Sequence, residues 1–370
     1  ISKAVATKSA FAATTPKERA AALRAIGESI EAAREKLIEI TMKETALPNG
    51  RLTGELSRTV FQLEQFAKLV ESGAHYQAII DRPDANWIPA PRPDIRKANQ
   101  ALGVAGIFAA SNFPFAFSTA GGDTAAALAA GCPVLVKSHP MHAGTGELVA
   151  SAVIKAAEKT GMPNGVFSNL LSSGIEVGQQ LVTHPKVKAV GFTGSIKGGR
   201  ALYDLAAKRD EPIPVFAEMG SINPVVILPK ALKNRHQEIA KTYASSITLG
   251  TGQFCTNPGL LLGIKSDSLS SFITHLSEEI LKIDPSCMLH PNIKKSYKIN
   301  KETVISQNNV SVVANFSSDV QNNFAQQAVV TVDGKSFLEN PILHLEVFGP
   351  FSMVVECVNE VELEMIITKI

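Results

Sequence analysis

The chain has 370 residues, of which 45% are hydrophobic and 19% charged, and its formal net charge is +2. This composition is ordinary for a globular protein, and the length allows two domains with sizeable cores. A net charge so close to zero argues against nucleic-acid and membrane partners, and no apolar run is long enough to predict a membrane span. The four cysteines show neither a disulfide framework nor a zinc spacing, so we expect reduced thiols, a cytoplasmic location and no metal site.

The N-terminal part of the chain has helical patterns. Residues 15–18 (Thr-Pro-Lys-Glu) form a capping box with proline at the first helical position, and apolar residues recur at helical spacing over residues 20–47. A second helix is expected over residues 52–72. Arg58 and Gln62 lie one turn apart on it, and we expect them to meet the carboxylate of an acidic substrate.

Four prolines within residues 81–93 predict an extended connector. After it, short apolar runs alternate with helical patterns, which predicts a parallel sheet covered by helices on both faces. The predicted strands are residues 102–109, 133–137, 165–171, 187–193, 214–218 and 224–228. Because ligands bind at the carboxyl ends of such strands, Lys137, Ser195 and Glu218 are expected at one rim of the sheet.

Each of these rim positions has a functional and a structural interpretation. Glycines between Gly194 and Gly199 would let a pyrophosphate approach the free N–H groups of a helix N-terminus, although an ordinary strand-to-helix turn has the same pattern. The ammonium of Lys137 would reach ribose or phosphate, or else remain in solvent. Glu218 stands in an apolar run, so we expect it to be buried, with its pKa raised towards that of a general base; a salt-bridged core glutamate is the alternative.

Two further stretches carry reactive side chains. Asn112 follows a predicted strand within residues 111–115, and its amide beside a thiol would act as an oxyanion donor; an Asx turn before proline is the alternative. Residues 250–258 place Cys255 on a glycine-rich turn between a predicted helix and a predicted strand. A thiol presented in this way can be a nucleophile, and a buried structural cysteine is the alternative.

Together these stretches resemble the NAD(P)-dependent aldehyde dehydrogenase superfamily. The motifs that carry the resemblance are Ser111-Asn-Phe-Pro-Phe115, Lys137, Phe192-Thr-Gly-Ser195, Glu218-Met-Gly220, Gly252-Gln-Phe-Cys-Thr256 and Glu346-Val-Phe-Gly-Pro350. Within the superfamily, the stretches Asn99-Gln-Ala-Leu-Gly103, Ala120-Gly-Gly-Asp-Thr124 and Glu218-Met-Gly-Ser-Ile-Asn-Pro224 are most similar to the α-ketoglutaric semialdehyde (2,5-dioxopentanoate) dehydrogenases.

The resemblance implies an oxidoreductase that converts an aldehyde to a carboxylic acid through a thiohemiacetal and a thioester. Cys255 would be the nucleophile, Asn112 would hold the oxyanion, and Glu218 would activate the hydrolytic water. The residues implied in cofactor binding are Lys137, Gly194, Ser195, Gly199, Glu346 and Phe348. NADP is the expected cofactor, with NAD as the alternative, because Pro140 stands where many NAD-specific relatives have a glutamate.

The implied fold class is α/β. N-terminal helices and a Rossmann-like cofactor domain would occupy residues 1–229, and an α/β catalytic domain carrying the cysteine would occupy residues 230–370, with its C-terminus incomplete. The substrate would be α-ketoglutaric semialdehyde or a related small-molecule semialdehyde, and the full chain would form a homodimer or homotetramer. The alternatives are a fatty or general aldehyde dehydrogenase, an acylating relative that uses coenzyme A, a cofactor-free cysteine hydrolase, and a truncated nucleotide-binding remnant without turnover.

Overall fold

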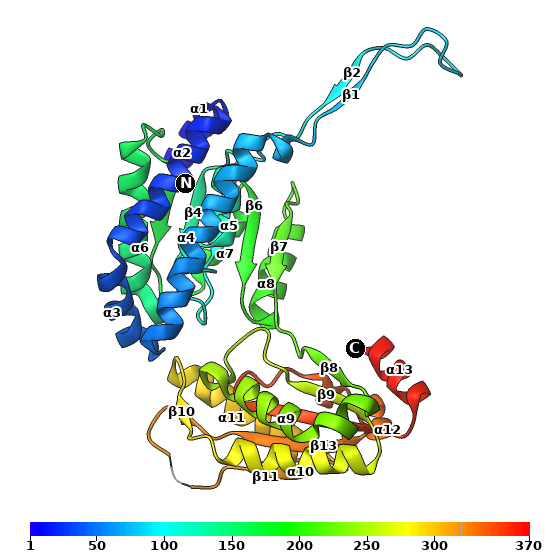
Figure 1. The fold of residues 1–370 in the computed structure, drawn as a ribbon. Helices are drawn as coiled ribbons and strands as arrows, with labels where there is room; N and C mark the ends of the chain where they lie inside the picture. The colour runs from blue at the N-terminus through cyan, green and yellow to red at the C-terminus, as the bar shows by residue number, and fades with distance from the viewer. Residues whose placement is uncertain (319) are drawn as a thin grey trace. The chain divides into compact units, whose positions relative to one another are not determined.

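The computed structural model describes residues 1–318 and 320–370 (Figure 1). The chain divides into two compact units, Ile1–Met219 and Gly220–Ile370, and each contains its own five-stranded sheet. No helix in the described part of the chain is long and apolar enough to cross a bilayer.

The first unit begins with helices. These are α1 (Ser2–Ala12), α2 (Pro16–Ala32), α3 (Arg34–Thr45), α4 (Asn49–Ser72) and the 3-10 turn η1 (Ala74–Tyr76). The predicted capping box is confirmed, since the Thr15 hydroxyl accepts a hydrogen bond from the backbone N–H of Glu18 and the Glu18 carboxylate accepts one from the backbone of Thr15. The prediction of one continuous helix over residues 20–47 is wrong. The backbone at Ala33 (φ −99°, ψ 8°) leaves the helical range and separates α2 from α3.

A parallel sheet lies at the centre of the first unit. Its strands are β3 (Val104–Phe108), β4 (Val134–Lys137), β5 (Phe167–Leu170), β6 (Val187–Thr193) and β7 (Val215–Glu218). The helices between them are α5 (Gly122–Ala129), α6 (Ala143–Lys159) with the preceding 3-10 turn η2 (Pro140–His142), α7 (Glu176–Thr183) and α8 (Ile196–Ala207). The predicted alternation is confirmed for these strands, whereas the alanine-rich helix α5 has no counterpart in the prediction.

The strand order decides where this sheet can bind a ligand. The order is β5-β4-β3-β6-β7, and every neighbouring pair is parallel. The chain runs outward from β3 to β5 and then returns to β6 on the other side of β3. The direction of winding therefore changes between β3 and β6, and ligands of such sheets bind outside the carboxyl ends of the strands at that point.

The connector predicted over residues 81–93 is an exposed arm of the first unit (Figure 1). The strands β1 (Ile79–Asp81) and β2 (Ile95–Lys97) pair antiparallel at its base, and Asp84 and Arg92 exchange backbone hydrogen bonds beyond them. None of the residues in either strand is buried, so the arm adds nothing to the core of the unit.

The second unit is built on a sheet of order β11-β13-β14-β9-β8. The strands are β8 (Pro224–Ile227), β9 (Leu260–Ile264), β11 (Ser311–Asn315), β13 (Ala328–Asp333) and β14 (Phe351–Cys357), and a separate pair joins β10 (Ser286–Cys287) to β12 (Phe324–Ala325). The helical segments are α9 (Pro229–Thr248), η3 (Leu249–Gly252), α10 (Asp267–Leu281), α11 (Pro291–Ile305), α12 (Gly334–Glu339), η4 (Pro341–His344) and α13 (Glu360–Lys369). Within the five-stranded sheet, β11 is antiparallel to its neighbour β13 and the other pairs are parallel, whereas the separate pair of β10 and β12 is antiparallel.

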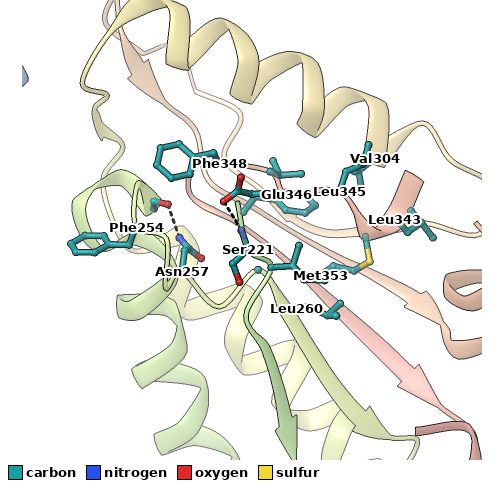
Figure 2. Close-up of a pocket in the computed structure, with 15 residues that line it drawn as sticks. Ser221, Phe254, Asn257, Leu260, Val304, Leu343, Leu345, Glu346, Phe348 and Met353 are labelled. Carbon is teal, nitrogen blue, oxygen red and sulfur yellow. Dashed lines mark hydrogen bonds between the residues drawn. The ribbon is translucent and has the colours of Figure 1, made fainter. Parts of the chain in front are cut away.

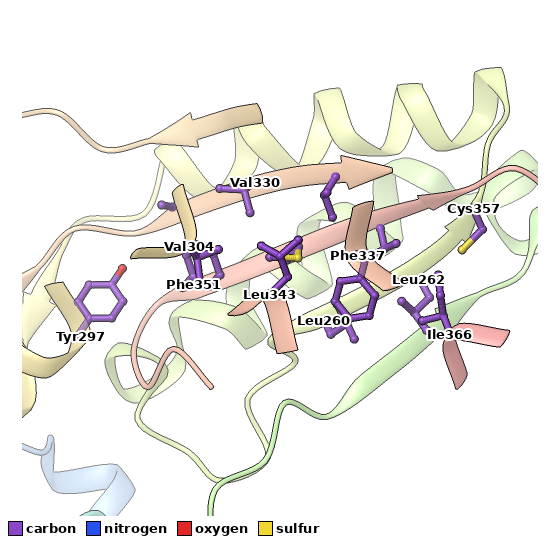
Figure 3. Packing of buried hydrophobic residues seen from close by; sticks show 14 of the residues in the cluster. Leu260, Leu262, Tyr297, Val304, Val330, Phe337, Leu343, Phe351, Cys357 and Ile366 are labelled. Atoms are coloured by element: carbon purple, nitrogen blue, oxygen red, sulfur yellow. The ribbon is translucent and has the colours of Figure 1, made fainter. Parts of the chain in front are cut away.

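Both faces of the second sheet are covered, because successive strand residues point to opposite sides. On one face, Leu260 and Leu262 belong to a buried cluster with Tyr297 of α11, Phe337 of α12 and Ile366 of α13 (Figure 3). On the other face, the intervening Leu261 belongs to a second buried cluster, with side chains of α9 and α10. This packing fixes the start of β9, which directly follows the predicted cysteine turn.

The assignment of residues 224–228 to the first sheet is wrong. The segment forms a strand, β8, but it pairs in parallel with β9 of the second sheet. The two units consequently separate at Met219–Gly220 rather than at the predicted boundary of residue 229. A short apolar run predicts a strand, whereas the sheet it joins depends on a partner distant in the sequence.

Candidate active site

Asn112 lies in the loop that follows β3, at the carboxyl edge of the first sheet. The loop is closed by a hydrogen bond from the backbone N–H of Ala110 to the carbonyl of Phe117 (2.9 Å). The Arg51 guanidinium donates to the Asn112 carbonyl (3.5 Å) and stacks over the Phe113 ring, with its Cζ 4.5 Å from the ring centroid. Asn112 itself is half-buried in this loop.

Glu55 of α4 anchors the same loop from beneath. One oxygen of its fully buried carboxylate accepts hydrogen bonds from the backbone N–H groups of Phe115 (2.8 Å) and Ala116 (2.9 Å), and the other pairs with Arg51 (2.6 Å). Burial raises the pKa of Glu55, although Arg51 and the two N–H groups favour its charged form. Sequence reasoning missed this residue; the one signal was a carboxylate beside Leu52 on the apolar face of the predicted helix.

The turn after β6 has the features of an anion site. The Ser195 hydroxyl caps α8 by accepting a hydrogen bond from the backbone N–H three residues later (3.2 Å), and the N–H of Gly194 donates to the carbonyl of Glu218 (3.0 Å). A β carbon at Gly199 would lie 2.5 Å from Cγ of Met219, so this position has no room for a side chain. The remaining N–H groups of the first turn of α8 suit a phosphate.

Lys137 ends β4 at the same edge of the sheet. Its ammonium donates to the carbonyl of Ser172 (2.7 Å), in the loop after β5, and is half-buried there. Burial lowers the pKa of Lys137. The lysine is therefore held at the end of its strand rather than extended into solvent.

Glu218 ends β7, and the expectation that it is buried is wrong. The structure leaves it exposed, because β7 is an edge strand and Glu218 is its last residue. The nearby carboxylate of Asp123, at the start of α5, is more enclosed: a β carbon on Gly191 of β6 would lie 2.9 Å from its oxygen. Burial raises the pKa of Asp123, and the negative charge of Glu218 acts in the same direction.

In the second unit, Cys255 presents an exposed thiol. The other three cysteines are more enclosed, since Cys132 and Cys357 are buried and Cys287 is half-buried. Burial raises the pKa of the Cys357 thiol to about 11, which leaves it protonated and unreactive at neutral pH. The alternative of a buried structural cysteine thus does not apply to Cys255.

Two asparagines hold the turn that carries this thiol. Asn223 has a left-handed backbone (φ 43°), and its side-chain amide donates to the carbonyls of Cys255 (2.6 Å) and Asn257 (2.9 Å). The Asn257 amide donates in turn to the carbonyls of Gly252 (2.9 Å) and Ile247 (3.0 Å). These bonds fix the backbone on both sides of the thiol, and sequence reasoning did not single out either asparagine as a support.

A cavity beside this turn is lined by two of the predicted cofactor-binding residues, Glu346 and Phe348 (Figure 2). Its walls include Phe254, Asn257, Glu346 and Phe348. The backbone N–H of Ser221 donates to the Glu346 carboxylate (3.3 Å), and burial raises the pKa of this half-buried group. Because Phe254 directly precedes Cys255, the cysteine turn and the Glu346 segment share one wall.

The predicted site residues therefore form two groups, one in each unit. The carboxyl edge of the first sheet carries Asn112, Lys137, Gly194, Ser195, Gly199 and Glu218. The second unit carries Cys255, Glu346 and Phe348. Within the described residues, no group of three or more histidine, cysteine or acidic side chains is arranged to hold a metal ion.

Comparison with known proteins identifies the family. A model of the aldehyde dehydrogenase family matches residues 1–367. The chain belongs to this family. The α-ketoglutaric semialdehyde dehydrogenase 2 of Azospirillum brasilense is 47% identical over 339 residues, which cover 92% of this chain and 65% of that protein. The α-ketoglutaric semialdehyde dehydrogenase of Acinetobacter baylyi is 43% identical over 351 residues, which cover 95% of this chain and 66% of that protein.

The chain of this aldehyde dehydrogenase family member thus spans slightly less than two thirds of these curated relatives. Among solved structures, a benzaldehyde dehydrogenase from Corynebacterium glutamicum superposes with a TM-score of 0.79 at 23% identity, covering 97% of this chain and 75% of that one. A salicylaldehyde dehydrogenase from Pseudomonas putida superposes with a TM-score of 0.80 at 19% identity, covering 99% of this chain and 73% of that one. At these identities the structures establish the fold, and the predicted resemblance is confirmed.

Proposed function

We propose that the chain is part of an NAD(P)-dependent dehydrogenase that oxidises α-ketoglutaric semialdehyde, or a related semialdehyde, to the carboxylic acid. The observation that carries the proposal is the exposed Cys255 thiol on a turn fixed by Asn223 and Asn257, in a member of the aldehyde dehydrogenase family. The substrate follows the two curated relatives, which are named for this semialdehyde. Assembly into a homodimer or homotetramer stays a prediction.

In the proposed reaction, the Cys255 thiolate attacks the aldehyde carbon and the carbonyl oxygen becomes an alkoxide. The Asn112 amide and the backbone N–H of Cys255 would donate hydrogen bonds to this oxygen. A donor that is already fixed stabilises the developing charge without reorganising, and losing one such donor costs roughly 10²–10³ in kcat. The clamp of Arg51 and Glu55 on the Asn112 loop supports this role, because it holds the loop before substrate arrives.

The second half of the proposed reaction is hydrolysis of the thioester. Glu218 would take a proton from water, and the hydroxide equivalent would attack the acyl carbon and release the Cys255 thiolate. The exposure of Glu218 supports this role, because a water molecule can reach its carboxylate. The Asp123 carboxyl nearby, with its raised pKa, is a second group able to hold a proton at this edge of the sheet.

The donor set of the first unit fits a dinucleotide. Lys137 would bind the adenosine ribose, and the capped N-terminus of α8, with Ser195 and the side-chain-free Gly199, would bind the pyrophosphate. Glu346 would accept a hydrogen bond from the nicotinamide ribose, with Phe348 packed beside it. When bound, the nicotinamide accepts the hydride that leaves the thiohemiacetal carbon.

NADP is the cofactor we favour. Pro140 begins η2, three residues after Lys137, so this position offers no carboxylate to repel a 2′-phosphate. Among the fold relatives, a glyceraldehyde-3-phosphate dehydrogenase from Methanocaldococcus jannaschii was solved with NADP, whereas the benzaldehyde dehydrogenase is described as NAD-dependent. The ratio of kcat/KM for NADP to that for NAD tests the preference, and a strong preference for NAD would contradict it.

The proposed function is tested by following NADPH absorbance with α-ketoglutaric semialdehyde, without coenzyme A, for the chain and its Cys255→Ala variant. We expect turnover that the variant abolishes, since no other described cysteine is exposed. Turnover that needs coenzyme A would instead indicate an acylating enzyme. Ester cleavage that ignores NADP, or cofactor binding without turnover, would reject the dehydrogenase proposal for this chain.

A further inference from the structure

One arginine of the first unit stands out by its surroundings. Arg58 of α4 is exposed, and its guanidinium lies over two aromatic rings, with Cζ 5.0 Å from the centroid of Phe117 and 5.9 Å from that of Phe113. The two rings contact each other edge to face at 5.1 Å. Stacking on aromatic faces restrains a guanidinium while its N–H donors remain available at the edge.

The charge of Arg58 has no counter-ion in the described part of the chain, where no carboxylate lies within 4.0 Å of it. Its neighbours on the helical bundle differ: Arg51, two turns earlier on α4, pairs with the buried Glu55, and Arg24 of α2 pairs with Glu64 and with Glu71. Since Arg51 and Glu55 cancel, this face of α4 carries the net positive charge of Arg58.

Gln62 adds a second polar group to this face of the helix. It lies one turn after Arg58 on α4, and its side-chain oxygen is buried without a hydrogen-bond partner among the described residues. Its side-chain nitrogen lies near Gly122, at the start of α5. A half-turn of an amide exchanges oxygen and nitrogen, so Gln62 can offer a ligand either an acceptor or a donor.

Arg58 also lies directly over the loop that carries the proposed oxyanion donor. Phe113, one of its two supporting rings, is the residue after Asn112, and Phe117 accepts the backbone hydrogen bond that closes this loop. A substrate whose aldehyde oxygen meets Asn112 therefore has a fixed cation close to the same loop. A short aldehyde with an acidic far end would use both.

We propose that Arg58, with Gln62 beside it, is the subsite that binds the carboxylate of an acidic aldehyde. The inference rests on the proposed aldehyde oxidation and deepens it, because it names the residues that select a semialdehyde over a neutral aldehyde. A 2-oxo acid presents a carboxylate and an adjacent carbonyl oxygen, which match the planar fork of a guanidinium. The site acts by binding and orientation, and no bond is made or broken there.

The test compares Arg58→Met and Arg58→Lys with Lys68→Met. Methionine keeps most of the stem that packs on the rings, and Lys68 is an exposed cation on the same helix, away from the Phe113 and Phe117 rings, so its variant controls for charge. For Arg58→Met we expect kcat/KM for α-ketoglutaric semialdehyde to fall about 20- to 100-fold, mainly through KM, and that for pentanal to change less than threefold. Arg58→Lys should recover part of the loss, and Lys68→Met should match the wild type.

Equal losses for both aldehydes would overturn the proposal, because they would show that Arg58 only supports the loop. No loss for either would overturn it as well. Binding of 2-oxoglutarate, the expected product, is measured separately by calorimetry on the same proteins; the wild type and Lys68→Met should bind it, and Arg58→Met should bind it at least tenfold more weakly. This measurement needs no turnover, so a failed dehydrogenase proposal and a failed carboxylate site give different results.

Discussion

Replacing Glu55 should release the loop that carries Asn112. Glu55→Ala leaves the backbone N–H groups of Phe115 and Ala116 without an acceptor. Each buried donor left unpaired in this way lowers the free energy of unfolding by about 1–3 kcal/mol. It also leaves Arg51, whose side chain is only 17% exposed, without its carboxylate, and breaking a buried pair costs about 3–5 kcal/mol. Because these contributions overlap, we expect a total of about 3–5 kcal/mol rather than their sum.

Glu55→Gln separates the two contributions. Both backbone N–H groups donate to the same oxygen of Glu55, while Arg51 pairs with the other. The glutamine oxygen can therefore keep both backbone bonds, while Arg51 loses its carboxylate in both variants, so Glu55→Gln should be less destabilising than Glu55→Ala. The difference between the alanine and glutamine variants then reports the two backbone hydrogen bonds.

Amide hydrogen exchange measures this difference at the loop itself. A loss of about 3 kcal/mol corresponds to a fall in protection of roughly a hundredfold or more, since every 1.4 kcal/mol is tenfold. We expect that fall at Phe115 and Ala116 in Glu55→Ala, a smaller one in Glu55→Gln, and none at Val330 in the core of the second unit. Equal losses in both variants, or unchanged protection in Glu55→Ala, would refute the reasoning.

Three further predictions concern the rest of the site. Pro140→Glu should lower kcat/KM for NADP at least tenfold, because a carboxylate near a 2′-phosphate is repulsive, and should leave that for NAD within about threefold; equal effects on both cofactors would contradict this. Because the folded-state pKa of Asp123 is raised, its charged form destabilises the folded protein. This destabilisation is absent below the usual aspartate pKa of about 3.9, where the carboxyl is neutral in both the folded and the unfolded state, and it is complete only above the folded-state pKa. Asp123→Asn should thus raise Tm at pH 7 and change nothing near pH 3. Asn223→Ala should destabilise the second unit by about 2 kcal/mol, because it removes two hydrogen bonds and places alanine in a left-handed backbone conformation. Asn223→Gly should destabilise it less, because glycine tolerates this conformation. Denaturant unfolding in which the alanine variant is more stable than the glycine variant would contradict the argument.

The elements that sequence could predict are those whose signal is local. The capping box at Thr15 and the strand β6, which has its predicted bounds of residues 187–193, depend on residues close to one another in the sequence. The rim of the first sheet was predictable for the same reason, since each polar residue directly follows an apolar run. Cys255 was predictable as a turn residue because glycines and a proline surround it, whereas the sequence left its exposure open.

What sequence could not predict depends on distant partners. Strand β8 has an ordinary strand pattern, and only its pairing with β9 shows which sheet it joins. Glu218 sits in an apolar run, and the position of β7 at the edge of the sheet decides its exposure. The bonds of Glu55 to Phe115 and Ala116 cross from α4 to a loop beyond the exposed arm, and no spacing rule connects such positions.

Two sequence motifs of the second unit behave as a single structural element, and this has a consequence for the proposed chemistry. Gly252, which opens the cysteine motif, has φ 65° and packs directly on the carbonyl of Gly349, which belongs to the Glu346 motif; a β carbon at Gly252 would overlap that carbonyl. A β carbon on Gly349 would in turn overlap the Tyr297 ring, and Asn257 donates to the carbonyls of both glycines. The thiol turn therefore cannot shift without moving the segment that carries Glu346, so an enlargement of either glycine should disturb the proposed nucleophile and the proposed nicotinamide-ribose contact together.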